Sequence, residues 1–396
     1  MKRFQMLMLA LLVTGNMIGA GILGMPITTG IAGLWPSLLI MLLFSFGMLF
    51  SALVLAKETN SIQKESFNLP SLYEKYLGTG GKWLGVIANL IILYGIMIGY
   101  LAGGTKIIVT ILDLSGFYEP LILLALFLSF TALTLSGMSI IQKYNTVLML
   151  SLWIAFFILV FMGASGVEIK RLHHVDWGYL PMAVPLIVAS LCFHNIIPTI
   201  CRESGWSQDI WKPIALGLLI GIVMNVIWIV VGIGVVPEFG HISLNQALHS
   251  GIPVTIEMSQ ILKSDAFALV GMVFAIIAIT TSYVTSGIGL KDFSTDLFEN
   301  SFGIHQQWLI MSVSFIPPLI TAYFFADIFL EALNIASGIG VVLLFGVLPS
   351  IIFYQKATSF LEKSMAVFFF TVFAIALSIT TLQTFGILHL HPNLMQ

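Results

Sequence analysis

The chain is built from long apolar stretches separated by short charged segments. Ten stretches of at least 23 residues contain no Asp, Glu, Lys or Arg. A helix that crosses the hydrocarbon core of a bilayer needs about 20 apolar residues. Each stretch is therefore long enough to span a membrane; the ten run over residues 4–56, 83–105, 120–142, 144–167, 177–201, 213–237, 266–290, 300–326, 332–355 and 364–396.

The first stretch is too long for a single crossing. Near Trp35 it is interrupted by Gly30, Gly33 and Pro36, residues that favour a tight turn. Dividing the stretch at this turn gives eleven spans. The apolar run continues to Ala56 without a small-residue cleavage site, which distinguishes it from a signal peptide. The pattern predicts an all-α, multi-pass integral membrane protein with eleven transmembrane helices.

Lysine and arginine are unevenly distributed between the two sides that these spans define. With the N-terminus inside, the outer side holds only Lys170, Arg171 and Lys263, while Lys106 lies in the third span near its outer end, where it can snorkel. Cytoplasmic loops carry the excess of basic residues, so we expect a cytoplasmic N-terminus and a C-terminus outside. The twelve inner residues are Lys2, Arg3, Lys57, Lys64, Lys75, Lys82, Lys143, Arg202, Lys212, Lys291, Lys356 and Lys363.

Two smaller expectations follow from the charged segments. The inner loop 57–82 has leucines and tyrosines at helical spacing, which predicts a short interfacial helix. The acidic residues Asp327, Glu331 and Glu238 fall at the outer edge of the spans, where we expect them to be solvated.

Composition narrows the class of protein further. Of the 396 residues, 58% are hydrophobic and 9% are charged, too little charge to cover a soluble surface. The net charge of −2 argues against nucleic acid as a partner. Cys192 and Cys201 match no zinc or disulfide pattern and are expected to be small buried side chains. We expect a monomer in a lipid bilayer, with no organic cofactor.

The first span contains residues that weaken a helix. Between positions 15 and 26 lie four glycines, Asn16 and Pro26. Each interior glycine costs about 1 kcal/mol and a proline about 3 kcal/mol relative to alanine. Open backbone at membrane depth is tolerated where it lines a cavity. The segment therefore predicts a helix break at a polar site; the alternative is close helix packing through small residues.

The sixth span has a second break signal. Pro198 removes a backbone hydrogen bond and disturbs the preceding turn, which carries His194 and Asn195. Polar residues of this kind are rare inside membranes and usually functional. The alternative is a histidine bonded to a neighbouring helix for stability alone.

The two breaks occupy matching positions in two halves of the chain. Each half holds five spans and begins with a broken helix, and five is odd, so the second half must be inverted in the membrane. We expect a first repeat at 1–164, an outer loop at 165–178, a second repeat at 179–355 and an eleventh helix with a short outer C-terminus at 356–396. Half-helix ends present free N–H groups and free carbonyls, and no charged side chain lies near either break. Such a site suits a zwitterion.

These segments resemble the hydroxy and aromatic amino acid permeases, bacterial members of the amino acid/polyamine/organocation superfamily with the LeuT-type fold. The resemblance covers nearly the whole chain and rests on residues 15–26, Phe193-His194 through Pro198, Thr281-Ser282 and residues 316–319. It implies an inner-membrane symporter for tyrosine, tryptophan, serine or threonine, usually proton-driven. It also implies that the first and sixth helices hold substrate, with the third and eighth beside them. Cys192 and Asn195 stand where glycines are expected, which bears on the size of the pocket.

The expected substrate site combines these positions. Its residues are Ile18, Gly19, Ala20, Gly21, Ile22, Tyr100, Cys192, Phe193, His194, Asn195 and Ser282. Gly95, Gly99 and Gly103 recur at four-residue spacing in the third span, and this row is expected to be a packing face.

The coupling ion is left open between H⁺ and Na⁺. A Na⁺ site would use the carbonyls of Gly15 and Ile18 and the hydroxyls of Thr281 and Ser282; the alternative is that these hydroxyls bond to their own helix. His194 is the candidate for proton coupling. In the tenth span, residues Asn334, Ser337 and Gly338 are expected to form an outer gate.

The sequence thus predicts a secondary transporter that imports an aromatic amino acid, tyrosine or tryptophan, by ion-coupled symport with alternating access. The alternatives are a symporter for serine, threonine or another neutral amino acid and, more remotely, an intramembrane enzyme, a channel or a sensor. The spans contain no His-Glu-x-x-His, Gly-x-Ser-x-Gly or paired aspartates, so an enzyme is not expected.

Overall fold

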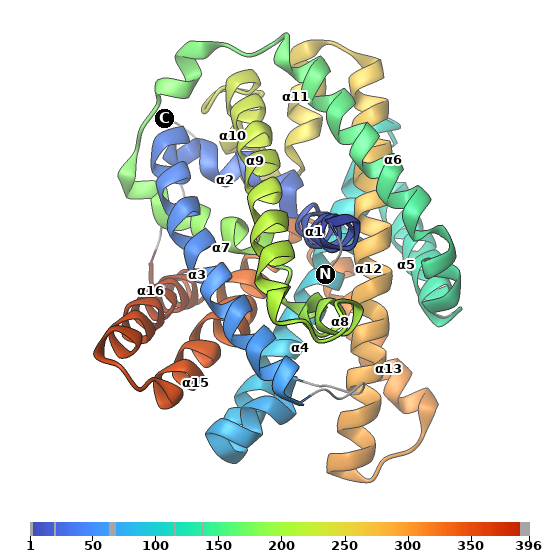
Figure 1. Cartoon of the computed structure of the whole chain (residues 1–396). Helices are drawn as coiled ribbons and strands as arrows, with labels where there is room; N and C mark the ends of the chain where they lie inside the picture. The colour runs from blue at the N-terminus through green and yellow to red at the C-terminus, as the bar shows by residue number, and fades with distance from the viewer. Residues whose placement is uncertain (1–2, 20, 63–68, 115, 137, 389–396) are drawn as a thin grey trace.

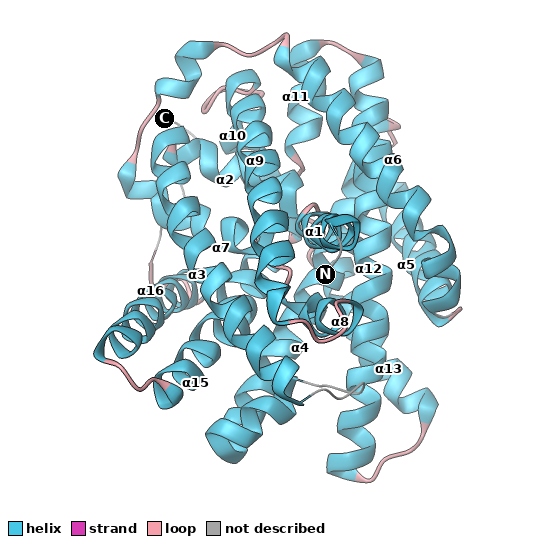
Figure 2. Cartoon of the chain, in the orientation of Figure 1, coloured by secondary structure: helices cyan, strands magenta, loops and turns pink. Residues whose placement is uncertain are grey.

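The computed structural model describes residues 3–19, 21–62, 69–114, 116–136 and 138–388, with the side chains of 138–146 and 300–302 left aside. Over these residues the chain is helical and contains no β-strand, only an isolated bridge between Gly33 and Val175 (Figure 2). Ten of the described helical segments are long and apolar enough to cross a membrane, and a bent helix pair brings the number to eleven. The all-α class and the approximate number of spans are therefore confirmed.

The helices follow the predicted spans in order. The first span is α1 (Arg3–Met17) with α2 (Gly21–Ala32), and the sixth is α7 (Leu180–Ser190) with α8 (Ile197–Glu203). The tenth is α14 (Phe329–Ile335), the π-helix η6 (Ala336–Val347) and α15 (Leu348–Lys356). The other spans are α3 (Leu34–Ile62), α4 (Leu69–Ile111), α5 (Glu119–Leu135), α6 (Met138–Ala164), α9 (Trp211–Val235), α12 (Asp265–Phe302), α13 (Gln307–Phe324) and α16 (Phe360–Thr384). Two short helices, α10 (Leu244–Ser250) and α11 (Val254–Leu262), lie between α9 and α12.

The helices α9 and α12 run lengthwise through the molecule, whereas α1 is seen nearly end-on beside them (Figure 1). Both α1 and α2 pack against α9. The predicted turn after the first span lies at Gly33, whose φ of 94° is a conformation that favours glycine. A Cβ there would lie 2.2 Å from the carbonyl oxygen of His174. The turn is therefore fixed both by its backbone conformation and by the loop packed on it.

Hydrogen bonds at helix ends sort the connections between helices into two groups. At one end, Gln5 donates to the Glu203 carbonyl (2.8 Å) and Asn60 donates to the Ser207 carbonyl (3.1 Å). At the other, Asp176 N–H donates to the Ala32 carbonyl at 2.8 Å. These groupings match the inner and outer sets expected from counting spans, and we call the two ends inner and outer on that basis.

Acidic residues at the outer end are paired rather than free in solvent, which corrects the expectation for two of them. Lys106 bridges Glu119 (3.0 Å) and Asp327 (2.9 Å). Glu238 is half-buried and lies 3.0 Å from the His174 imidazole. Burial raises the pKa of Glu238 to about 7, an effect that His174 opposes. These contacts tie the outer loops together, a role that spacing in the sequence did not indicate.

The inner loop 57–82 contains the predicted short helix, which is continuous with the third span except for a kink. Residues 69–77 are helical and join α4 through a kink at Gly78, where φ is 69° and ψ is −165°. We call residues 69–77 the inner brace. The buried Tyr73 of the brace donates its hydroxyl to the Leu344 carbonyl in η6 at 2.5 Å. The brace is thus fastened to the tenth span.

Candidate site at two interrupted helices

The first span is interrupted where the sequence is richest in glycine. The helix α1 ends at Met17, α2 begins at Gly21, and their axes differ by 63°. Ile22 N–H donates to the Gly19 carbonyl at 3.2 Å, which starts α2 with a tight turn. Ala20, one of the expected site residues, lies outside the described residues.

The outer half of this span is stabilised by a tryptophan from α9. Pro26 has no N–H, so the carbonyl of Ile22, four residues earlier, lacks its helical donor. The buried indole of Trp228 donates to that carbonyl at 2.8 Å. One turn further on, Gly232 packs so closely on Pro26 that a Cβ would lie 2.4 Å from it. The proline is accommodated because α9 supplies both the missing donor and the space.

The sixth span is interrupted as predicted. The helix α7 ends at Ser190, a short 3₁₀ turn covers His194–Ile196, and α8 begins at Ile197. Pro198 lies in the first turn of α8, where its missing N–H costs no helical hydrogen bond. The side chain of Asn225 in α9 donates to the Ser190 carbonyl at 3.3 Å. The proline therefore starts the second half-helix instead of kinking a continuous one.

The two interruptions lie against each other. A Cβ on Gly21 would lie 3.5 Å from the Ala189 Cβ and 3.9 Å from the Ser190 backbone nitrogen. On the other side, a Cβ on Gly19 would lie 3.5 Å from the Ser282 hydroxyl and 3.8 Å from the Tyr100 hydroxyl. The structure thus brings four predicted positions, on the first, third and eighth spans, around one break.

The remaining predicted substrate residues differ in exposure. Ile18, Ile22 and Phe193 are buried, Cys192 is half-buried, and Asn195 is exposed. Ile18, Ile22 and Phe193 therefore belong to the core that surrounds the breaks. Asn195 is the one residue of this set whose side chain is largely solvent-accessible in the described structure.

His194 is fully buried and faces the second and tenth spans. Its Nε2 lies 2.7 Å from the Ser51 hydroxyl of α3. The imidazole is stacked between Phe193 (centroids 5.0 Å apart) and Phe345 of η6 (4.9 Å). Nδ1 has no hydrogen-bond partner among the described residues. The bond to Ser51 is the contact with a neighbouring helix that a purely structural histidine would make. Nδ1 remains able to take part in proton transfer, the functional role proposed from the sequence.

Of the two hydroxyls proposed for a Na⁺ site, that of Thr281 bonds within its own helix. Thr281 donates to the carbonyls of Ile277 (2.9 Å) and Ala278 (3.1 Å). This is the local bonding expected as the alternative, although it leaves the oxygen lone pairs of Thr281 available. The Cα–H side of Gly15 faces α6, since a Cβ there would lie 1.8 Å from the terminal methyl of Met149. Ser282 is half-buried beside Gly19.

The three residues expected to form an outer gate, Asn334, Ser337 and Gly338, lie in three different environments. Asn334 lines a cavity of about 670 Å³ together with Thr28 of α2, Pro185 of α7 and Gln383 of α16. Ser337 donates to the Leu333 carbonyl in its own helix at 2.5 Å. Gly338 packs against α16, where a Cβ would lie 2.5 Å from the Thr380 side chain. Of the three, only Asn334 borders this outer cavity.

Sequence reasoning missed the contribution of α9. Five of its residues recur at helical spacing on one face: Gly217, Gly221, Asn225, Trp228 and Gly232. Close approach of α1 explains the glycines. A Cβ on Gly217 would collide with Ala10 and Val13, and a Cβ on Gly221 would collide with Met17. The signal was present as a stripe of small and polar residues in an otherwise apolar span.

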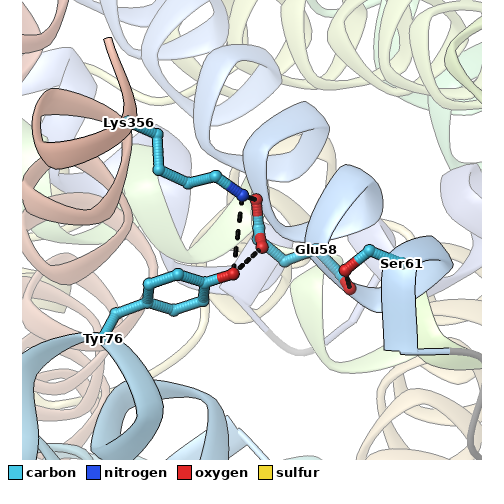
Figure 3. Close-up of polar contacts among 4 residues, drawn as sticks. All are labelled: Glu58, Ser61, Tyr76 and Lys356. Atoms are coloured by element: carbon cyan, nitrogen blue, oxygen red, sulfur yellow. Dashed lines mark hydrogen bonds and ion pairs between the residues drawn. The ribbon is translucent and has the colours of Figure 1, made fainter.

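An ionic cluster around the buried Glu58, at the inner end, was also missed (Figure 3). Glu58 of α3 is 2% exposed, lies 2.5 Å from the Lys356 ammonium of α15, and accepts a hydrogen bond from the Tyr76 hydroxyl of the inner brace. Lys356 also lies 3.4 Å from that hydroxyl. Glu58 and Lys356 are 298 positions apart, so no local pattern could pair them.

The fold and the site define this chain as a multi-pass membrane protein whose first and sixth spans are interrupted and meet. Comparison with known proteins then gives the family. The model of the tryptophan/tyrosine permease family matches residues 2–389, and the chain belongs to that family. It is a family of permeases, not of enzymes.

Its relatives include transporters with different named substrates. The chain is 25% identical over 334 residues to the tyrosine-specific transport system 2 of Haemophilus influenzae, covering 83% of this chain and 82% of that protein. It is 24% identical over 392 residues to the tryptophan-specific transport protein of the same organism (91% and 89%). It is also 24% identical over 351 residues to the glutamine transporter 2 of Aliivibrio fischeri (86% of each).

Proposed function

We propose that this chain is a secondary active transporter that imports an aromatic amino acid, tyrosine or tryptophan, across the bacterial inner membrane. The observation that carries the proposal is the meeting of two interrupted helices at Gly21 and Ser190. Helix interruptions at membrane depth are tolerated where they line a site, and their free N–H and C=O groups suit the two charges of an amino acid. Membership of the tryptophan/tyrosine permease family supports an amino acid substrate.

The fold we propose is a 5+5 inverted repeat of the LeuT type, with repeats at 1–164 and 179–355, the outer loop 165–178 between them and the eleventh helix in 356–396. Helix contacts support it. The third span packs on the tenth (α4 on α14 and η6), as the eighth packs on the fifth (α12 on α6). The first packs on the seventh (α1 and α2 on α9), as the sixth packs on the second (α7 and α8 on α3). Each contact recurs between the spans at the equivalent positions of the two halves, five spans apart, as two copies of one unit would produce.

The side on which each terminus lies is part of the same proposal. The inner end holds Gln5, the brace and Lys356, and the positive-inside bias places this end in the cytoplasm. The transporter acts as a monomer because each repeat supplies one interrupted helix, so that one chain completes the site.

Uptake by purified protein in liposomes tests the function. Labelled tyrosine or tryptophan should accumulate under an imposed ion gradient, and an ionophore should abolish the accumulation. Competition by the twenty amino acids ranks the substrates and separates the aromatic from the serine, threonine or glutamine alternatives. Flux that is indifferent to the gradient would indicate a channel, and failure of every amino acid to enter would refute the proposal.

A variant at the first interruption provides the matched test. Gly19→Leu extends a side chain beyond a Cβ that already lies 3.5 Å from the Ser282 hydroxyl, so uptake should fall to background. Gly80→Leu is the control, since nothing lies within 4 Å of a Cβ there. Equal uptake by both variants, at equal expression, would remove the first interruption from the site.

Symport is driven by H⁺ or Na⁺ in this proposal. Na⁺ would use the carbonyls of Gly15 and Ile18 and the hydroxyl oxygens of Thr281 and Ser282, which have lone pairs to offer a cation. H⁺ would use His194. Separate gradients of the two ions in liposomes distinguish them. If protons drive uptake through His194, His194→Ala should lose the dependence on a pH gradient, and an unchanged dependence would return His194 to a structural role.

A further inference from the structure

Asn225 lies on the face of α9 that contacts the first span. One turn before it, Gly221 packs on Met17, the last residue of α1; one turn after it, Trp228 bonds to Ile22, near the start of α2. Asn225 is therefore level with the interruption between the two half-helices. Its own hydrogen bond reaches the last residue of α7, so it stands beside both interruptions at once.

The orientation of the amide is determined by its neighbour. The Ser190 carbonyl can only accept a hydrogen bond, so Nδ2 of Asn225 faces it, at 3.3 Å, and Oδ1 points elsewhere. The residue is fully buried, and Oδ1 has no hydrogen-bond partner among the described residues. A buried acceptor without a donor is costly and uncommon in native proteins. An acceptor held in this way at a substrate site calls for a donor from the ligand.

The surroundings favour a positively charged donor. The C-terminal ends of α1 and α7 both lie next to Asn225, and a helix C-terminus carries partial negative charge. No acidic side chain is present on either half-helix pair near the breaks. A neutral amide oxygen with helix carbonyls can hold an ammonium group, which offers three donors, without requiring a fixed counter-ion.

We propose that Oδ1 of Asn225 accepts a hydrogen bond from the α-ammonium group of the transported amino acid. The inference rests on the proposed function and adds the group by which the seventh span recognises substrate. It makes Asn225 a binding residue, held in place by Ser190 of the sixth span. Recognition of the amine is then shared between the interrupted helices and an unbroken one.

Ligand binding by purified full-length protein tests this, with tyrosine and its analogue without the amine, 3-(4-hydroxyphenyl)propanoate, as probes. Asn225→Leu and Asn225→Ala should weaken tyrosine binding by about 10- to 100-fold, the range expected for losing a hydrogen bond to a charged group. Binding of the analogue, measured by competition, should change less than about 3-fold by the same reasoning. Asn245→Leu, which removes a buried asparagine of α10 away from the breaks, is the control and should bind tyrosine as the wild type does.

The contrary outcomes are distinct. Tyrosine affinity unchanged in both Asn225 variants would overturn the proposal. Equal losses for tyrosine and the analogue would assign Asn225 a structural role instead, and a loss confined to measurements in Na⁺ would assign Oδ1 to the ion. Failure of the wild-type protein to bind any amino acid would instead refute the transport function itself.

Discussion

At the scale of single residues, the site depends on backbone groups whose usual partners are absent. Pro26 leaves the Ile22 carbonyl without a helical donor, and Trp228 of α9 replaces it. This exchange moves a hydrogen bond from within the first span to the contact between two spans. The orientation of α2 is therefore linked to α9 by a directional bond as well as by packing.

Removing the indole donor tests this exchange. Trp228→Phe should lower stability by roughly 1–3 kcal/mol for the unsatisfied carbonyl, in addition to the loss from the smaller ring. Pro26→Ala restores the N–H, so Trp228→Phe should cost less in that background. Thermal unfolding of the four proteins in detergent gives the coupling, and strictly additive effects would contradict this account of Pro26.

A second residue-scale prediction concerns pH. Glu257 of α11 is 3% exposed, and burial raises its pKa from 4.5 to about 7. Below pH 4.5 both folded and unfolded states hold the proton. Between pH 4.5 and 7 only the unfolded state releases it, so the folded state loses stability, by roughly 3 kcal/mol at most above pH 7.

Glu257→Gln removes this titration. The variant should have a higher Tm than the wild type at pH 8, and the difference should vanish near pH 4. Glu331→Gln, at an exposed position, is the control substitution. A constant difference between Glu257→Gln and wild type across this range would show that Glu257 does not titrate as burial requires.

At the scale of elements, the inner brace joins three spans. It reaches the tenth span through Tyr73 and the second through Tyr76 and Glu58, while Gly78 allows it to turn away from the rest of α4. Glu58 is buried but Lys356 is partly exposed, with 43% of its side chain accessible. Loss of Lys356 would leave a buried carboxylate without a cation, whereas loss of Glu58 would leave an ammonium group that water can reach.

The difference leads to a test by paired substitutions. Lys356→Met leaves a buried carboxylate without its cation and should cost roughly 3–5 kcal/mol, whereas Glu58→Gln leaves a lysine that water can solvate and should cost less. The double variant should be more stable than Lys356→Met alone. Thermal unfolding measures all three, and equal losses for the two single variants would contradict the burial of Glu58.

The elements also show what could be read from the sequence. Both interruptions, the turn at Gly33 and the helix before Gly78 were predicted, because glycine, proline and helical periodicity are local signals. The role of α9 was missed because its stripe of small and polar residues gains meaning only when α1 and α2 lie on it. The contacts of Glu58, Lys106 and His194 join distant segments, so the chain order gives no indication of them.

At the scale of the whole molecule, both interrupted spans are packed against unbroken helices. The first span is covered by α9, the sixth by α3, and the tenth span packs on α7. The outer cavity of about 670 Å³ lies between the outer halves α2 and α7 and the helices α14 and α16. Opening and closing of such halves around a fixed site is the motion that alternating access requires.

The most direct test of the central claim is a structure of the protein determined with bound tyrosine or tryptophan, whichever the uptake assay ranks first. Ligand density should lie between the two interruptions, in contact with Gly21 and Ser190. Density found only in the outer cavity, with Gly21 and Ser190 still in direct contact and no ligand between them, would contradict the account.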